Sequence, residues 1–164
     1  MERPVIFLQS LLVLVVAIQV ISACNCGERR TMKESICLNE TLVMATPVQK
    51  YLADKNENTV YDLSSAYYTV YKTYINTTYH EGPNKMSDDH QYFELFTPRK
   101  IRDCGVPFKT DISYYIAGTV RIDGSLFVTS CDYAAPVHRH LPHEDVELLN
   151  DLIHRSPVDC TALA

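Results

Sequence analysis

The sequence predicts a small, mainly β protein with flanking helices, built on a closed five-stranded antiparallel barrel of the OB type. Two observations support this prediction. Short runs rich in Tyr, Val, Ile and Phe recur between turn-forming residues, as expected for strands. A segment with helical features follows them near the C-terminal end. Five strands with irregular loops close most economically as this barrel.

The first half of the chain contains two of the expected strands. Residues 38–48 are rich in Leu, Val and Met and predict a strand, in which Pro47 marks a bend or an edge. Residues 49–62 are polar and predict a hairpin loop. Residues 66–75 are rich in Tyr and Val and predict the second strand, and a long loop is expected over 77–90.

Three further strands are expected in the second half. Residues 92–97 predict one, which stops at Pro98. Residues 112–120 and 125–131 predict the other two, with Asp123-Gly124 as the turn between them. These strands complete the set that the barrel requires.

Residues 142–154 predict a helix. Pro142 suits the first helical position, and Glu144 and Asp145 suit the N-terminal end of the helix dipole. The apolar residues that recur on one expected face are Val146, Leu149, Leu152 and Ile153.

The beginning of the chain predicts a secretory signal peptide over 1–23. A charged start is followed by an apolar run and then by a small residue, Ala23. Cleavage after Ala23 would leave a domain over 24–160 that begins with Cys24, and a short tail over 161–164. An uncleaved membrane anchor is disfavoured because the run is short and has no basic stop-transfer flank. A bacterial lipoprotein cleavage box is disfavoured by the further cysteines and the glycosylation sequons.

Length and composition set outer limits on the function. The chain has 164 residues, a formal net charge of -5 and 46% hydrophobic residues. This length suits one domain with a real core, and the composition is that of a folded protein. Because the chain is not basic, nucleic acid is not expected as a partner. We expect a monomer with no membrane contact after signal cleavage.

An even number of cysteines in a secreted chain predicts a disulfide framework. The spacing leaves the connectivity open, although pairing each early cysteine with a late one would close long loops, each worth roughly 4 kcal/mol on the entropy model. A zinc finger is excluded, because there is no Cys-x2-Cys pair and the compartment is oxidising. The cysteines expected to form three disulfides are Cys24, Cys26, Cys37, Cys104, Cys131 and Cys160.

Two N-glycosylation sequons are consistent with a secreted protein. One begins at Asn39 and continues with Glu40 and Thr41, and the other begins at Asn76 and continues with Thr77 and Thr78. Both asparagines are therefore candidate surface positions and candidate glycosylation sites.

An enzymatic function is disfavoured. The chain has no Gly-x-Ser-x-Gly elbow for a serine nucleophile, no glycine-rich phosphate loop and no cysteine that is expected to be free. His138, His140 and His143 could together bind zinc, but no nearby Cys, Asp or Glu completes a site before Glu144. We favour exposed histidines without a metal and keep an enzyme with a metal site in this histidine loop as an alternative.

A mature chain that begins with Cys24 would present its α-amine and its carbonyl oxygen in the geometry of a five-membered chelate. A catalytic zinc keeps an open position for water, and these two groups can replace that water. Because a free α-amine has a pKa of about 7.7–8.0, metal binding near neutral pH must displace a proton. The side chain of Asn25 would then point where a substrate side chain goes. The alternative is an ordinary N-terminus that happens to be disulfide-bonded.

Several spaced motifs occur in the order found in one known protein family. They are Cys24-Asn25-Cys26, Cys37, Phe-Glu-Leu-Phe-Thr-Pro at 93–98, Cys104-Gly105, Tyr-Ile-Ala-Gly at 115–118, Asp123-Gly124, Phe-Val-Thr-Ser-Cys at 127–131, Ala135-Pro136 and Cys160. With these motifs, the chain resembles the N-terminal domain of the tissue inhibitors of metalloproteinases over essentially its whole mature length.

This resemblance implies a netrin-like barrel of the OB type and a set of functional residues. It implies that Cys24 chelates the catalytic zinc of a target protease, and that Asn25 enters the pocket for the substrate side chain just after the scissile bond. The implied disulfides are Cys24–Cys104, Cys26–Cys131 and Cys37–Cys160. The implied protease-binding residues are Cys24, Asn25, Cys26, Gly27, Ile101, Arg102, Asp103 and Cys104.

The chain departs from the usual pattern of this family in two respects. The family usually has Thr or Ser where this chain has Asn25, and Asn is bulkier and carries polar groups that need partners when buried. Arg102 and Asp103 replace small or apolar residues and bring charge to the expected contact edge. Because only residues 161–164 follow Cys160, functions that belong to the family's C-terminal domain are not transferred to this chain.

The sequence therefore predicts a secreted, single-domain inhibitor of zinc metalloproteinases of the metzincin type. Its expected partners are matrix-type metalloproteinases or related metzincins in the extracellular space or matrix. It has no expected cofactor of its own, because the zinc belongs to the target protease. The alternative function is that of a netrin-like extracellular binding module that inhibits no protease.

Overall fold

A computed structural model describes residues 24, 26–52, 68–86 and 91–161 of the chain. The predicted signal peptide and Asn25 lie outside these residues. Most of the loop expected over 49–62, part of the loop expected over 77–90 and most of the tail expected over 161–164 also lie outside them.

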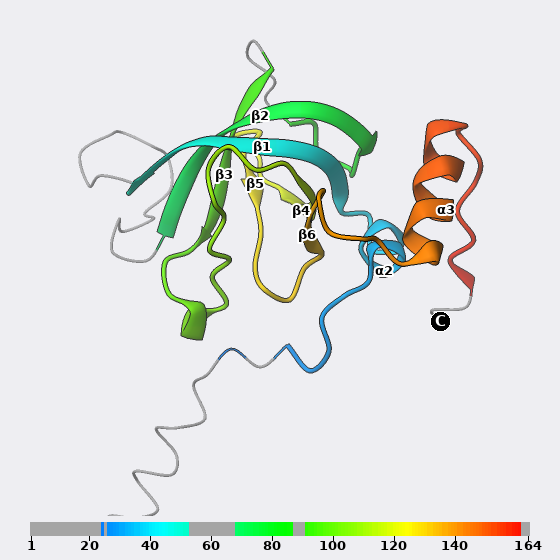
Figure 1. Ribbon diagram of the computed structural model, residues 1–164, viewed down its shortest axis with the longest axis horizontal. Coiled ribbons are helices and arrows are strands. Elements are labelled where there is room, and N and C mark those ends of the chain that lie inside the picture. The colour runs from blue at the N-terminus through cyan, green and yellow to red at the C-terminus, as the bar shows by residue number, and fades with distance from the viewer. Residues whose placement is uncertain (1–23, 25, 53–67, 87–90, 162–164) are drawn as a thin grey trace, which may run out of the picture.

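A closed barrel of five strands forms the centre of the structure (Figure 1). β1 (Thr41–Leu52) pairs with β2 (Tyr68–His80), and β2 pairs with β3 (Tyr92–Pro98). β3 pairs with β5 (Leu126–Phe127), and β5 pairs with β4 (Tyr114–Val120). β4 also pairs with β1, which closes the barrel. The predicted five-stranded barrel is confirmed.

The prediction that all pairings are antiparallel is wrong at one place, because β3 and β5 pair in parallel, whereas the other pairings of the barrel are antiparallel. Leu95 of β3 lies opposite Leu126 of β5, and Phe96 lies opposite Phe127, with both strands running in the same direction. The carbonyl oxygen of Phe96 also accepts a hydrogen bond from the amide of Val128 just after β5. Because parallel strands end at the same edge, the loops that follow β3 and β5 leave the barrel together.

β1 and β2 are longer than the sequence-based prediction. β1 continues to Leu52, so residues 49–52 are strand rather than loop, and Pro47 is accommodated where the register with β2 shifts between Pro47 and Gln49. β2 continues to His80 rather than ending at 75, because Thr77 and Thr78 still pair with β1. Polar residues in this hairpin are therefore part of the barrel wall.

The strand expected over 125–131 is much shorter in the structure. β5 is confined to Leu126–Phe127, and a short strand that the sequence did not predict, β6 (Ala134–Pro136), pairs with β4 farther along the same edge. Close approach of the strands requires glycine at Gly118, where a Cβ atom would lie 2.5 Å from the carbonyl oxygen of Phe127. The residues between β5 and β6 form a loop at the end of the barrel.

Aromatic and branched side chains fill the barrel interior. The ring of Phe108 stands edge-on to Tyr71 and Tyr114, with ring centroids 5.6 and 5.2 Å apart. The buried residues of this core are Val43, Ala45, Tyr71, Phe93, Leu95, Phe108, Tyr114, Ile116, Val120, Leu126 and Val128.

A helix that the sequence analysis missed, α2 (Met32–Cys37), packs against the outside of the barrel. Its first turn is closed by a capping box, in which the Thr31 hydroxyl accepts the Glu34 amide hydrogen and the Glu34 carboxylate accepts the Thr31 amide hydrogen. The Thr-x-x-Glu spacing is the sequence signal for this helix. The Cys37–Cys160 disulfide, which the resemblance implied, joins the end of α2 to the segment after α3.

The predicted C-terminal helix is present as α3 (His143–Ile153), but its buried face differs from the prediction. Leu148, Leu149 and Asp145 face the barrel, whereas Val146 and Ile153 are 43% and 59% exposed. Pro142 is the N-cap residue rather than the first helical position.

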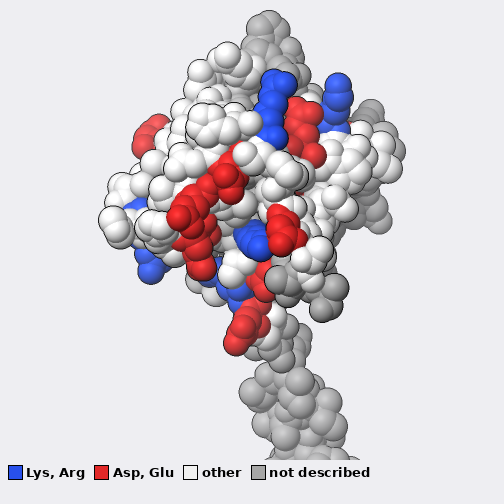
Figure 2. Space-filling view, turned by 90° about the vertical axis from the view of Figure 1, so that its right-hand side faces the viewer, with Lys and Arg blue, Asp and Glu red and all other residues white. Residues whose placement is uncertain are grey.

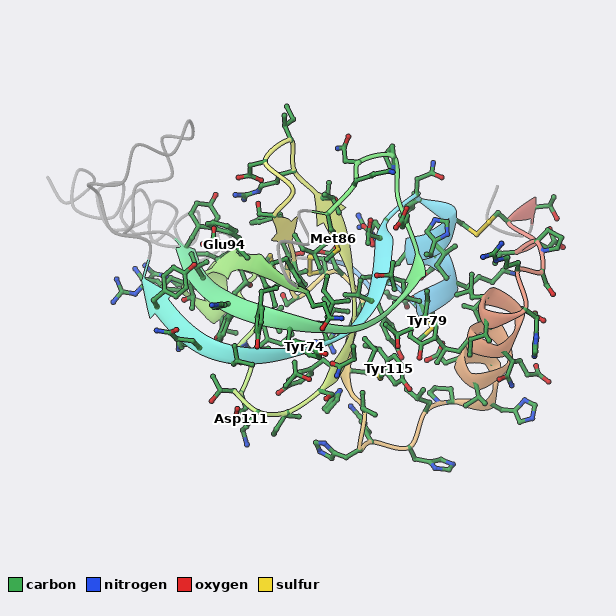
Figure 3. The ribbon with its side chains drawn as sticks, turned by 90° about the horizontal axis from the view of Figure 1, so that it is seen from above. Tyr74, Tyr79, Met86, Glu94, Asp111 and Tyr115 are labelled. Atoms are coloured by element: carbon green, nitrogen blue, oxygen red, sulfur yellow. A yellow bond between two sulfur atoms is a disulfide. The ribbon has the colours of Figure 1, made fainter. Side chains whose placement is uncertain are left out.

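A buried hydrogen bond contributes to the orientation of α3. The Tyr133 hydroxyl donates to the Asp145 carboxylate at 2.7 Å, and burial raises the pKa of Tyr133, so the tyrosine keeps its proton. Tyr79 and Tyr115, which lie to the left of α3 in the view of Figure 3, belong to the same cluster, and their ring centroids are 6.1 Å apart. The buried face of α3 therefore combines Leu148 and Leu149 with Asp145.

Replacing Tyr133 with Phe should lower the free energy of unfolding by about 1–3 kcal/mol, because the buried Asp145 carboxylate loses its hydrogen-bond donor. Urea denaturation would measure the loss. The matched control is Tyr74→Phe, which removes an exposed hydroxyl bond to Gln91 and should cost less than about 0.5 kcal/mol. Equal losses in the two variants would show that the Tyr133 hydroxyl does not hold α3.

Candidate functional site

Two disulfides hold the first described residues between the two loops that leave the barrel together. This arrangement of Cys24, Cys26, Cys104 and Cys131 is here called the clamp. Cys24 is bonded to Cys104 in the loop after β3, and Cys26 is bonded to Cys131 in the loop after β5. The Cα–Cα distances are 5.0 and 5.1 Å. Both pairings are those that the resemblance implied, and no cysteine of the chain is free.

Backbone hydrogen bonds join the same three segments. The Cys24 nitrogen donates to the carbonyl oxygen of Arg102 at 2.8 Å. The Ser130 nitrogen donates to the carbonyl oxygen of Cys104 at 2.8 Å, and the Arg30 nitrogen donates to the carbonyl oxygen of Cys131 at 3.0 Å. The main chain of Cys24 is therefore held by a hydrogen bond, while its side chain is held by a disulfide.

The loop after β3 owes its shape to a tight turn. A short 3-10 helix, η2 (Ile101–Asp103), follows Lys100, whose carbonyl oxygen accepts hydrogen bonds from the nitrogens of Asp103 and Gly105. Cys104 ends the helix in the left-handed region, with φ of 67°. At Gly105 a Cβ atom would lie 2.0 Å from the carbonyl oxygen of Pro98, so only glycine fits. This turn brings Cys104 back toward the N-terminal segment.

The structure brings together the described residues of the predicted protease-binding edge. Cys24 and Cys26 are half-buried at the clamp, and Gly27 is exposed with φ of 64°. Ile101 is 71% exposed beside them. Asn25 lies outside the described residues.

The charged residues of η2 are exposed and interact weakly with each other. The Arg102 Nε atom lies 3.7 Å from Asp103 Oδ1, and their side chains are 69% and 45% exposed. An ion pair in contact with water contributes little, so both charges stay available to a partner.

Ser130 and Arg29 were not predicted as site residues from the sequence. The Ser130 hydroxyl lies 3.3 Å from the Cys24 sulfur, and the Arg29 side chain donates from Nε to the Ser130 carbonyl oxygen at 3.2 Å. Both residues extend the clamp, and the position of Ser130 next to Cys131 is the sequence signal that could have indicated it.

The four sulfur atoms of the clamp do not form a metal site of this chain. The Sγ atoms of Cys24, Cys26, Cys104 and Cys131 all lie within 4.8 Å of one another. Each of them is bonded in a disulfide, and a metal needs the thiolate form. The clamp therefore offers no thiolate ligand to a metal.

The histidine loop forms no metal cluster. His138, His140 and His143 are exposed. In the part of the chain that the structure describes, the clamp cysteines are the only group of His, Cys, Asp and Glu side chains close enough together to hold an ion.

A scan against protein families matches residues 22–157 to the family described as "Tissue inhibitor of metalloproteinase". The chain belongs to this family. The members of this family are protease inhibitors and are not themselves enzymes. Membership of the family suggests that the chain inhibits metalloproteinases. Proteins of the family are typically extracellular. A search of curated proteins found no match to the chain.

Among the described residues, no helix is both long and apolar enough to span a membrane.

In this member of the family, a partly buried ionic network joins the N-terminal segment to the barrel and to the loop after β5. The Arg30 guanidinium forms ion pairs with the Glu40 carboxylate, just before β1, and with the Asp132 carboxylate, the latter at 2.9 Å. Asp132 in turn accepts hydrogen bonds from the amide and hydroxyl of Thr129 at 2.7 and 2.8 Å. Burial raises the pKa of Glu40, and Arg30 opposes that rise. Arg30 thus ties the N-terminal segment to the barrel and to the loop after β5.

Both sequon asparagines are exposed, as the sequence predicted. Asn39 lies in the turn between α2 and β1 with φ of 60°. Asn76 lies on β2, where its Oδ1 atom accepts a hydrogen bond from the Thr46 hydroxyl at 2.8 Å. Glycans at either position stay a prediction.

Replacing Arg30 with Gln should lower the free energy of unfolding by about 1–2 kcal/mol near pH 7, a modest loss because 40% of the Arg30 side chain is exposed. A raised pKa means that the stability contributed by Glu40 is fully present below its unfolded pKa, about 4.3, and is lost as pH rises through the folded value. Without Arg30 the pKa of Glu40 rises further, so the loss should shrink near pH 4.

Urea denaturation at both pH values measures this effect. Arg155→Gln, at an exposed position after α3, is the matched control and should change stability by less than about 0.5 kcal/mol. The same loss for Arg30→Gln at both pH values would indicate that Arg30 acts by packing alone.

Proposed function

We propose that this chain is a secreted inhibitor of zinc metalloproteinases of the metzincin type, which enters the active-site cleft as a wedge and is not turned over. The observation that carries the proposal is the 2.8 Å hydrogen bond from the Cys24 nitrogen to Arg102, next to the Cys24–Cys104 disulfide. We assign the inhibitory domain to residues 24–160, after a signal peptide over 1–23 and before a short tail over 161–164.

Removal of the signal peptide would turn the Cys24 nitrogen into a free α-amine. In the neutral amine, one N–H can keep the bond to the Arg102 carbonyl oxygen, while the lone pair stays available for a metal. The carbonyl oxygen of Cys24 supplies the second ligand of a five-membered chelate. The zinc belongs to the protease, where it activates a water molecule in an open coordination position. Displacing that water removes the nucleophile of the protease.

The clamp contributes affinity by preorganisation. Cys24 is held by one disulfide and one hydrogen bond, and Cys26 is held by a second disulfide only two positions later. An interface whose backbone is already ordered loses less conformational entropy on binding. The wedge therefore needs little rearrangement when it meets a rigid cleft.

We assign the specificity of the wedge to residues on either side of Cys24. Asn25 would enter the pocket that receives the substrate side chain after the scissile bond. Cys26, Gly27 and Cys104 would contact the cleft through their backbone. Ile101, Arg102 and Asp103 would meet its rim.

The proposed partners are matrix-type metalloproteinases or related metzincins in the extracellular space or matrix, bound one to one by a monomeric inhibitor. Asn39 and Asn76 are proposed glycan sites. Both are exposed on elements other than the clamp, so a glycan there is compatible with the wedge.

Adding one alanine before Cys24, or acetylating the α-amine of the processed protein, should weaken inhibition on the order of 100-fold or more, because neither product can offer a free amine to the zinc. The inhibition constant against a panel of matrix-type metalloproteinases is the measurement. An alanine added after Ala164 is the matched control and should have no effect. Undiminished inhibition by the N-terminally extended protein would refute chelation, and no inhibition by the correctly processed protein would favour a netrin-like binding module.

Substitutions of Asn25 should change selectivity among proteases. Asn25→Gly should weaken inhibition by about 10-fold because the pocket loses its occupant, and Asn25→Thr should strengthen it against matrix-type enzymes because no amide has to find partners. Asn150→Thr, at an exposed position on α3, is the matched control. If neither change at Asn25 alters any inhibition constant, this side chain does not occupy a specificity pocket.

A further inference from the structure

Basic side chains surround the clamp, although the protein as a whole is acidic. The formal net charge of the chain is -5. In the described segments that form the clamp, residues 26–30, 99–105 and 128–132, exposed cations nevertheless outnumber exposed acids, which are Glu28 and Asp103. The exposed cations, here called the basic rim, are Arg29, Arg99, Lys100 and Arg102.

The basic rim is connected directly to the atoms proposed to bind zinc. The carbonyl oxygen of Arg102 holds the Cys24 nitrogen, and the carbonyl oxygen of Lys100 accepts two of the hydrogen bonds that shape η2. The Arg29 side chain donates to Ser130, whose hydroxyl contacts the Cys24 sulfur. When Cys24 is seated in a cleft, these cations must therefore lie at the edge of that cleft.

A group of exposed acidic side chains lies on a different side of the molecule, on α3. Figure 2 faces the side that carries α3, and acidic side chains are prominent there. On α3, Glu144, Glu147 and Asp151 are exposed. In Figure 1, α3 lies at the right, whereas η2 lies at the lower left. The protein thus has a charge asymmetry, with its basic side at the clamp.

We infer that the target metalloproteinase carries acidic side chains along the rim of its cleft, and that the basic rim of this inhibitor pairs with them and steers association. This inference rests on the proposed function and adds the charge of the partner surface. Charges at the rim of an interface act mainly on the association rate and its dependence on salt. Separated basic and acidic sides also orient a protein in the field of its partner.

A protein surface fits this rim better than a sulfated polysaccharide does. Ile101 lies among the cations and is 71% exposed, and an apolar side chain inside a charged border is the arrangement of protein interfaces. Asp103 lies 3.7 Å from the Arg102 side chain and would repel a continuous polyanion. The structure therefore favours discrete carboxylates on a protein partner.

The test reverses the charge of the rim in the full processed protein. Arg102→Glu and Lys100→Glu, singly and together, leave the backbone carbonyl groups that shape the clamp in place. The double variant should associate about 10-fold more slowly with an inhibited metalloproteinase at low salt, and its association rate should no longer fall as salt is added. The dissociation rate should change much less. Arg155→Glu, an exposed cation after α3, is the matched control and should leave the association rate nearly unchanged.

Progress curves of inhibition at several salt concentrations give both rate constants, and thermal unfolding verifies that the variants are folded. An association rate and salt dependence equal to those of the unsubstituted protein, with inhibition intact, would overturn this inference and leave the proposed function standing. A variant that loses retention on immobilised heparin while keeping its association rate would assign the rim to polysaccharide and also overturn it. If the unsubstituted processed protein inhibits no metalloproteinase, the proposed function itself fails.

Discussion

The structure depends on the way one residue, Cys24, is held. The disulfide to Cys104 restrains its side chain, and the hydrogen bond to the Arg102 carbonyl oxygen restrains its main chain. Neither restraint alone would orient the residue, because a disulfide still allows the backbone to turn and a single hydrogen bond near the surface is easily exchanged with water. Together they keep the nitrogen and the carbonyl oxygen of Cys24 in place before any partner arrives.

The barrel is what makes this double restraint feasible. β3 and β5 run in parallel, so the loops after them emerge side by side and present Cys104 and Cys131 to the same segment. The turn that returns Cys104 requires glycine at Gly105, where no side chain can fit. Arg30 then ties the segment to β1 and to the loop after β5. Stability of the barrel and geometry of the clamp are therefore linked through the same few residues.

The exposed charges of the protein are also distributed unevenly around the clamp. Basic side chains lie around the clamp, although the overall charge of the protein is negative. Exposed acidic side chains lie on α3, on another side of the molecule. Such a separation does not affect the fold, because exposed charges contribute little to stability. Its consequence lies in recognition, where the sign of the charge around a contact surface decides which partners approach productively.

The sequence by itself determined the five-stranded barrel and the family, because strand patterns, turn residues and spaced motifs are local features. It left the pairing of the cysteines open, and the three disulfides were implied only by the resemblance to the family. The resemblance also placed Ile101, Arg102 and Asp103 at the expected contact edge. The ends of β1 and β2, the small strand β6 and the buried face of α3 could not be read from the sequence, because they depend on pairing across the barrel and on the Tyr133–Asp145 hydrogen bond. Only the tertiary structure decided that the Cys24 nitrogen meets Arg102 and that Ser130 and Arg29 join the clamp, since these contacts link residues far apart in the chain.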